Sequence, residues 1–180
     1  MSSQDRVEPT SVLAESKRRV MKENVFDVLM YLFENYMEEG PEFRPDQKAL
    51  THELAEAGFR KGEIRKAFAW LEALSAQRAH QVRAAMQHDA AALRHYTFPE
   101  HTKLDSTCRG FLLVMEQNGV LDPQTRELVI DRAMALEMDE ITLEQLKWII
   151  LMVLFNQPGQ EHAYALLEDL VFDEIQGHLH

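Results

Sequence analysis

The chain of 180 residues contains a single cysteine, Cys108, so no disulfide can form within it. A chain without disulfides fits a reducing compartment. Long apolar runs are lacking too. The longest, from Trp148 to Phe155, covers eight residues, whereas a membrane-spanning helix needs about 20. We therefore expect a cytoplasmic protein without a membrane partner.

Basic side chains are scarce. The sequence has 19 Lys and Arg against 30 Asp and Glu, which gives a net charge of −11. Repulsion from DNA, RNA and anionic membranes is the default expectation for such a chain. The charge is uneven, with a net of −4 in residues 21–76, +2 in residues 77–98 and −10 in residues 99–180. A local basic surface could still bind nucleic acid.

Glycine is limited to seven residues, which stand singly near the ends of the predicted helices, so no glycine-rich phosphate loop is expected. Strand-like alternation bounded by hairpin turns is also absent. Apolar side chains recur instead at helical spacing. This pattern predicts an all-α fold with about seven helices, at residues 24–37, 46–58, 61–76, 99–117, 122–136, 143–155 and 160–175.

These helices are expected to form a bundle in two parts. Residues 21–76 should form a three-helix unit that resembles a helix-turn-helix, and residues 99–180 a four-helix unit. Residues 77–98 are interpreted as a linker or partial helix, because their apolar side chains are mostly small. Residues 1–20 are predicted to be a disordered tail.

The best-defined helix covers Leu143 to Phe155. Thr142 and Gln145 have the spacing of a capping box, which marks its first turn. The helix is apolar nearly all round, and such a helix must be buried centrally. We therefore expect it to be the core of the bundle.

Four blocks of the sequence together resemble the bacterial Smg family of uncharacterised proteins. They are VFDVLMYLFE at 25–34, AFAWLE at 67–72, DSTCRGFLL at 105–113 and LKWIILMVLFNQPG at 146–159. The resemblance extends from Met21 to the C-terminus. It implies no established activity, cofactor or catalytic residue, and only an association with genes for DNA processing.

Candidate catalytic groups are weak. Cys108 is a potential nucleophile, but His101 lies two helical turns away, roughly 10 Å along the axis, which is too far for a hydrogen bond. His52 and Glu53 begin a zinc-binding HExxH pattern, but Glu56 stands where the second histidine is required. We therefore predict a structural Cys108, no metal or cofactor, and no enzymatic activity.

Two functional hypotheses remain. The favoured one is a non-catalytic adaptor or regulatory protein that acts through contacts with a protein partner. The alternative is a helix-turn-helix nucleic-acid-binding protein that uses the predicted helix 61–76. The first turns of this helix and the turn before it, residues 60–66, carry Arg60, Lys61, Arg65 and Lys66 against one acid, Glu63. The identity of the partner and the oligomeric state are left open.

Overall fold

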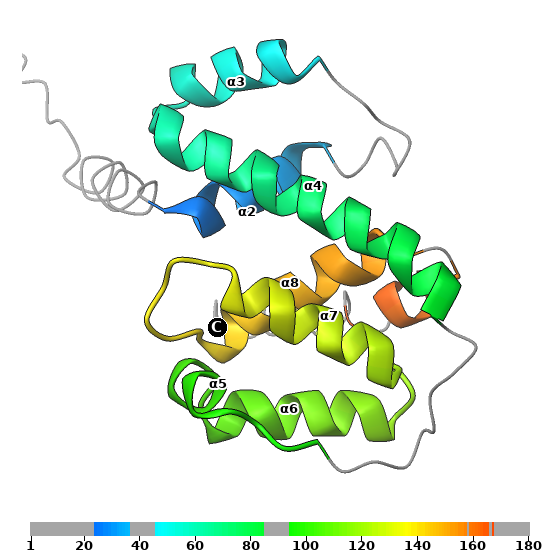
Figure 1. Ribbon diagram of the computed structural model, residues 1–180. Coiled ribbons are helices and arrows are strands. Elements are labelled where there is room, and N and C mark those ends of the chain that lie inside the picture. The colour runs from blue at the N-terminus through cyan, green and yellow to red at the C-terminus, as the bar shows by residue number, and fades with distance from the viewer. Residues whose placement is uncertain (1–23, 37–45, 85–93, 158, 166, 168–180) are drawn as a thin grey trace, which may run out of the picture. The chain divides into compact units, whose positions relative to one another are not determined.

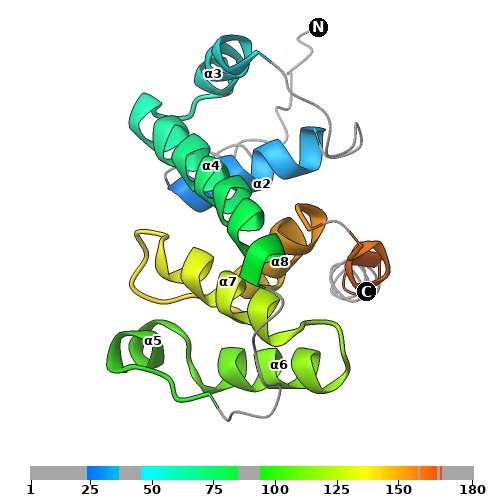
Figure 2. The same ribbon diagram turned by 45° about the vertical axis from the view of Figure 1, so that its right-hand side comes forward.

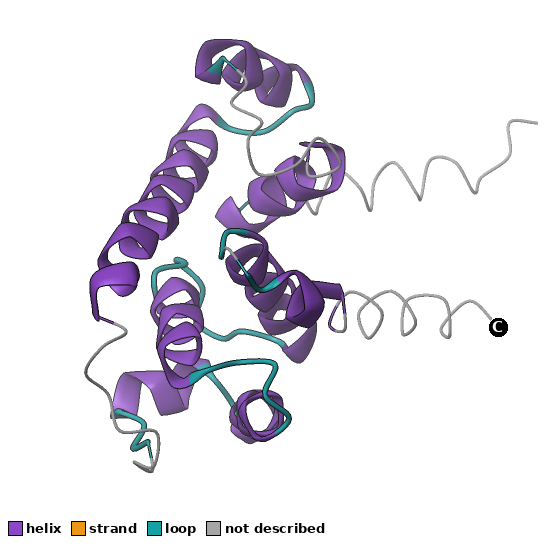
Figure 3. Ribbon diagram, turned by 90° about the vertical axis from the view of Figure 1, so that its right-hand side faces the viewer, coloured by secondary structure: helices purple, strands orange, loops and turns teal. Residues whose placement is uncertain are grey.

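The computed structural model describes residues 24–36, 46–84, 94–157, 159–165 and 167. Within these residues no strand forms, and Leu104 and Ile141 make one isolated bridge (Figure 3). The named helices are α2 (Val25–Tyr36), α3 (Gln47–Glu56), α4 (Lys61–Ala84), α5 (Phe98–Lys103), α6 (Ser106–Gln117), α7 (Pro123–Met134) and α8 (Leu143–Phe155) (Figure 1). The prediction of an all-α fold is confirmed.

The chain divides into two compact units. Residues 1–38 and 42–67 belong to an N-terminal unit, and residues 39–41 and 68–180 to a C-terminal unit. Helix α4 contributes to both, because the boundary between residues 67 and 68 lies within it. The helix continues to Ala84, beyond the predicted end at residue 76. The extension is rich in Ala, Gln and Arg, which favour helix, and contains no glycine or proline. The predicted tail 1–20 and residues 85–93 of the predicted linker lie outside the described residues.

The N-terminal unit contains α2, α3 and the start of α4. Asp46 caps α3 by accepting a hydrogen bond from the backbone N–H of Lys48. The helix ends at Glu56 with Ala57 as its C-cap, and Gly58 follows with a φ of 98°, which suits glycine. Phe59 follows and donates its N–H back to the carbonyl of Leu54, and its buried ring meets Tyr31 edge-on at 5.4 Å. This closed turn orients α4 relative to α3, so the predicted helix-turn-helix-like arrangement is present.

The C-terminal unit is built around α8, which packs against α6 and α7 (Figure 2). Every residue from Leu146 to Leu154 is buried. The prediction of a central apolar helix is confirmed, as is its capping box at Thr142 and Gln145. Lys147 is buried with its neighbours, and its Nζ lies 5.7 Å from the centre of the Phe111 ring. No helix of the described residues has the length and apolar character needed to cross a membrane.

The prediction of one helix over residues 99–117 is wrong. Two helices, α5 and α6, are separated at Leu104, whose backbone is extended. Leu104 bridges to Ile141, and the Ile141 N–H donates to the carbonyl of Lys103 at 2.9 Å. Asp105 then restarts the helix by accepting from the N–H of Cys108 at 2.7 Å. A long-range backbone contact and a local cap together override the continuous helical pattern.

Candidate functional site

A basic face lies at the start of α4. The side chains of Arg60, Lys61, Arg65 and Lys66 are all exposed. Lys61 and Arg65 are one turn apart and stand on the same side of the helix. The Nζ of Lys66 lies 3.4 Å from Oε1 of Glu63, the one acidic residue in the first turn. The structure thus leaves exposed the four basic residues that the sequence singles out, all within the turn before α4 and its first two turns.

A second surface is the exposed face of α6. Six residues of α6 are exposed, and none of them is charged: Ser106, Thr107, Gly110, Leu113, Val114 and Gln117. Leu113 is 51% exposed and Val114 45%. The two charged residues of α6 bond within the C-terminal unit instead. Arg109 donates to the carbonyl of Leu104, and Glu116 pairs with Arg126. We call these six exposed residues the α6 face.

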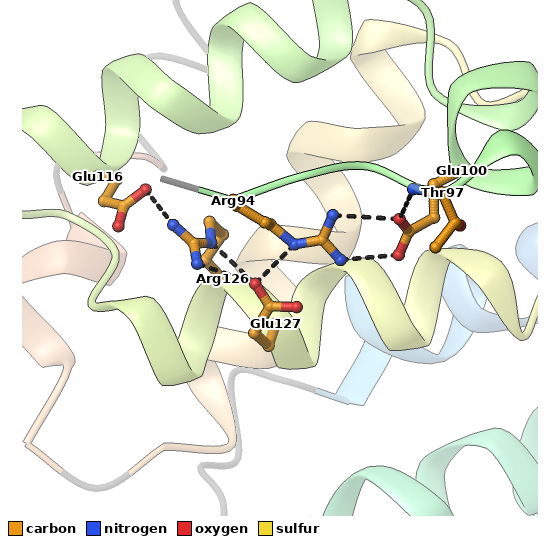
Figure 4. A network of polar contacts seen from close by, with 6 residues as sticks. All are labelled: Arg94, Thr97, Glu100, Glu116, Arg126 and Glu127. Carbon is orange, nitrogen blue, oxygen red and sulfur yellow. Dashed lines mark hydrogen bonds and ion pairs between the residues drawn. The ribbon is translucent and has the colours of Figure 1, made fainter. Parts of the chain in front are cut away.

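An ion-pair ladder ties the segment before α5 to α6 and α7 (Figure 4). Arg94 pairs with Glu100 and Glu127, each at 2.7 Å. Arg126 pairs with the same Glu127 at 2.9 Å and with Glu116 at 2.5 Å. Both arginine side chains are largely buried, at 15% and 11% exposed. The ladder is an internal fastening and leaves neither arginine presented to a ligand.

Glu100 is the most strongly held carboxylate of this ladder. It accepts hydrogen bonds from Arg94 and from the backbone N–H of Thr97 at 2.7 Å. The bonds from Arg94 stabilise the charged form and lower the pKa of Glu100 to about 2. A carboxylate whose pKa is lower in the folded state stabilises the fold above its unfolded pKa, near 4.5. That contribution is lost as the pH falls towards about 2.

Replacing Glu100 by glutamine should therefore lower the free energy of unfolding at pH 7 by about 2 kcal/mol. The deficit should shrink below pH 4.5 and nearly vanish by about pH 2. Urea unfolding followed by circular dichroism at several pH values measures both effects. Glu53→Gln, at an exposed position of α3, is the matched control and should change stability by under about 0.5 kcal/mol. A Glu100→Gln deficit independent of pH would contradict the ionic account.

Cys108 lies in α6 and is buried, and its Sγ donates to the carbonyl of Ile141 at 3.3 Å. Burial, followed by its contacts with Asp105, raises the pKa of the thiol to about 12. A thiol in this state is not a nucleophile at neutral pH. The side chains of His52 and Glu56 are both exposed, and Nδ1 of His52 lies 3.5 Å from Oε2 of Glu56. Within the described residues, no group of three or more potential ligands could hold a metal ion.

A family model described as "Protein of unknown function (DUF494)" matches residues 25–180. The chain is 56% identical over 160 residues to the "Protein Smg homolog" of Nitrosococcus oceani, which covers 89% of this chain and all of the relative. The chain belongs to the Smg family. It is also 52% identical over 157 residues to "Protein Smg" of Serratia proteamaculans, covering 87% of this chain and all of that relative. No solved structure matches it significantly.

Membership of the Smg family confirms the resemblance seen in the four sequence blocks. The sequence did not reveal the α6 face, although a signal is present. Uncharged residues recur there at spacings of three and four, at positions 106, 107, 110, 113, 114 and 117. With one long helix expected over residues 99–117, the buried and exposed sides could not be assigned. The ends of that helix had to be known first.

Proposed function

We propose that this Smg-family protein is a non-catalytic cytoplasmic adaptor that binds a protein partner through the α6 face. One observation carries the proposal. Every residue of the twelve-residue helix α6 that is exposed is uncharged, and its two charged residues are half-buried, in a chain of which 27% is charged. Adjacent exposed apolar side chains rimmed by polar residues are typical of protein-interaction sites. Leu113 and Val114 are two of the three large hydrophobic side chains that are exposed in the described residues.

Gly110 gives the α6 face its shape. It lies in the middle of α6, and a Cβ built on it meets no atom within 4 Å. A glycine inside a helix costs about 1 kcal/mol relative to alanine. Packing within the described residues does not explain why a glycine stands here rather than an alanine. An external helix could approach closely above Gly110 and contact Leu113 and Val114 on either side, which accounts for a glycine at this position.

The partner is expected to present an apolar helix within a basic surface. Residues 99–180 contain 5 basic and 15 acidic side chains. The net negative charge of this half of the chain would speed association with a basic protein and disfavour acidic ones. The non-catalytic part of the proposal is supported by Cys108, whose raised pKa removes the one cysteine as a nucleophile.

Site-specific crosslinking tests the α6 face in cells that express the full chain natively. A photoreactive phenylalanine analogue at Leu113 should form a discrete adduct with a partner protein. Adding Gly110→Arg should abolish that adduct, because a long charged side chain fills the contact. The variant should be as stable as the wild type or more so, by about 0.5–1 kcal/mol, because arginine favours helix more than glycine does.

Two controls separate a specific contact from surface stickiness. The same analogue at Ala135, an exposed position just after α7, should give no adduct. Ala135→Arg should leave the Leu113 adduct intact, although it adds the same charge. The adduct should also survive nuclease treatment. Equal crosslinking from both positions, or an adduct that persists in Gly110→Arg, would refute an adaptor role for this face.

A further inference from the structure

The basic face at the start of α4 places positive charge where a helix does not favour it. A helix carries a partial positive charge at its N-terminus, so cations are unfavourable in its first turn. Arg60 and Lys61 stand at this end, and Arg65 and Lys66 follow within two turns. All four side chains are exposed. Lys61 in the first turn opposes the helix dipole, and the exposed Arg65 on the same side adds to the positive charge, so charge complementarity favours a ligand of negative charge.

Gly62 is an independent feature of the same turn. Its backbone is helical, and a Cβ built on it meets no atom within 4 Å. Neither the backbone conformation nor packing requires glycine here, and glycine weakens a helix. Ala69, further along the same side as Lys61 and Arg65, is also exposed and small. The start of α4 is therefore a slim helix surface on which a bulky ligand could come close to the backbone.

We infer that the α3–turn–α4 arrangement binds double-stranded DNA, with the first two turns of α4 in the major groove. The charge complementarity is direct, because the basic face meets phosphates on both sides of the groove. The major groove of B-form DNA is about 12 Å wide and admits an α-helix. The deep, narrow major groove of double-stranded RNA does not. DNA is thus the duplex whose shape this surface fits.

The turn before α4 fixes the helix for this role. Gly58 donates to the carbonyl of Ala55 and Phe59 to that of Leu54, so two of the last carbonyls of α3 are satisfied. The side chains of Leu54, Phe59 and Ile64 are buried behind the basic face. Because this turn is packed by buried side chains, it holds the exposed side of α4 in a fixed orientation.

Nearby acids limit the contact to the start of α4. Glu63 pairs with Lys66 on the edge of the basic face. Glu72 is exposed two turns beyond Arg65 on the same side, where it would face a phosphate unfavourably. The net charge of −11 also opposes binding at long range. We therefore expect moderate affinity, with a dissociation constant of about 10⁻⁵ M at low salt.

Fluorescence anisotropy with the full-length chain and a duplex DNA of about 25 base pairs tests the inference across a salt series of about 50 to 200 mM. The logarithm of the affinity should fall against that of salt with a slope of about −3 to −4, one unit for each phosphate neutralised. The double variant Lys61→Ala, Arg65→Ala should bind about 100-fold more weakly at 50 mM salt, and its slope should be smaller by about two.

A matched variant separates the basic face from overall charge. Ser106→Glu, Thr107→Glu lowers the net charge by the same two units, at exposed positions in the first turn of α6. It should bind DNA within about twofold of the wild type. An equal loss of affinity in both double variants would overturn the assignment. So would a wild-type chain that stays folded but shows no binding at 50 mM salt.

Gly62→Leu tests groove insertion apart from charge. A Cβ at Gly62 meets no atom within 4 Å, and leucine favours helix more than glycine does, so the melting temperature should not fall. Affinity for duplex DNA should fall about tenfold, because the added side chain holds α4 away from the groove. Unchanged affinity would overturn insertion of α4. Equal wild-type affinity for double-stranded RNA, single-stranded DNA or heparin would overturn the choice of duplex DNA.

Discussion

Replacing Trp70 by alanine is expected to lower the free energy of unfolding by about 4 kcal/mol. Trp70 lies in α4 and is 5% exposed within the C-terminal unit. Its indole N–H donates to the carbonyl of Arg132 in α7 at 2.9 Å. Arg132 returns a bond from Nη1 to the Trp70 carbonyl at 3.3 Å, and its guanidinium lies 5.8 Å from the ring centre. The alanine variant loses the buried ring and leaves a cavity beside Arg132.

Chemical denaturation followed by circular dichroism at 222 nm measures this effect without relying on tryptophan fluorescence. Trp70→Phe should cost less, about 1–2 kcal/mol, because it keeps most of the apolar volume and loses the indole hydrogen bond. Gln77→Ala removes the neighbouring bond of 2.9 Å from α4 to Asp131, which is exposed, and should cost under about 1 kcal/mol. Similar losses in all three variants would contradict the dominant role assigned to the buried ring.

Lys103→Met is expected to cost about 3 kcal/mol, although methionine preserves the length of the side chain. Lys103 is 8% exposed. Its Nζ donates to the carbonyls of Met134, at 3.2 Å, and Leu136, at the end of α7. A positive charge at this end also complements the helix dipole. Methionine would leave two carbonyls without their donor in a site that water reaches poorly.

Lys48→Met provides the matched control. Lys48 is exposed in the first turn of α3, so the same atoms are exchanged without removing a buried donor. Its stability should stay within about 0.5 kcal/mol of the wild type. Urea titrations of the two variants at pH 7 allow a direct comparison. If Lys103→Met lowered the free energy of unfolding no more than the control does, water would have to donate hydrogen bonds to the carbonyls of Met134 and Leu136 in place of Lys103. That result would contradict the role assigned to Lys103.

The two proposed surfaces can fail separately. Gly110→Arg changes the α6 face in the C-terminal unit, whereas Lys61→Ala, Arg65→Ala changes the basic face in the N-terminal unit. Partner crosslinking should respond to the first and DNA binding to the second. If Gly110→Arg keeps DNA binding and Lys61→Ala, Arg65→Ala keeps partner crosslinking, the protein would act as an adaptor between DNA and a protein partner. Loss of one activity alone would leave the other proposal standing.

Local rules were sufficient for the helices with clear caps. The capping box of Thr142 and Gln145, followed by apolar residues on every side, determined both the bounds of α8 and its burial. Asp122 and Pro123 likewise marked the start of α7, and Gly58 the end of α3. In each case the deciding residues are adjacent in sequence, so no distant contact was needed.

The break between α5 and α6 depends on tertiary structure. Leu104 leaves the helical conformation to pair with Ile141, a residue 37 positions later. The helical pattern of residues 99–117 contains no sign of that contact. The length of α4 has a local cause instead, because residues 77–84 are rich in helix-favouring Ala, Gln and Arg and contain no glycine or proline.

By itself, the sequence determined the all-α fold, the central helix, the family and the four basic residues before and within the first turns of α4. Periodicity and capping are local properties, and charge can be counted directly. The tertiary structure alone decided which sides of the helices face solvent. It buried Lys103 and Lys147, joined Trp70 to Arg132, and exposed the uncharged α6 face. Exposure depends on which elements pack together, and so it could not be assigned before the fold was known.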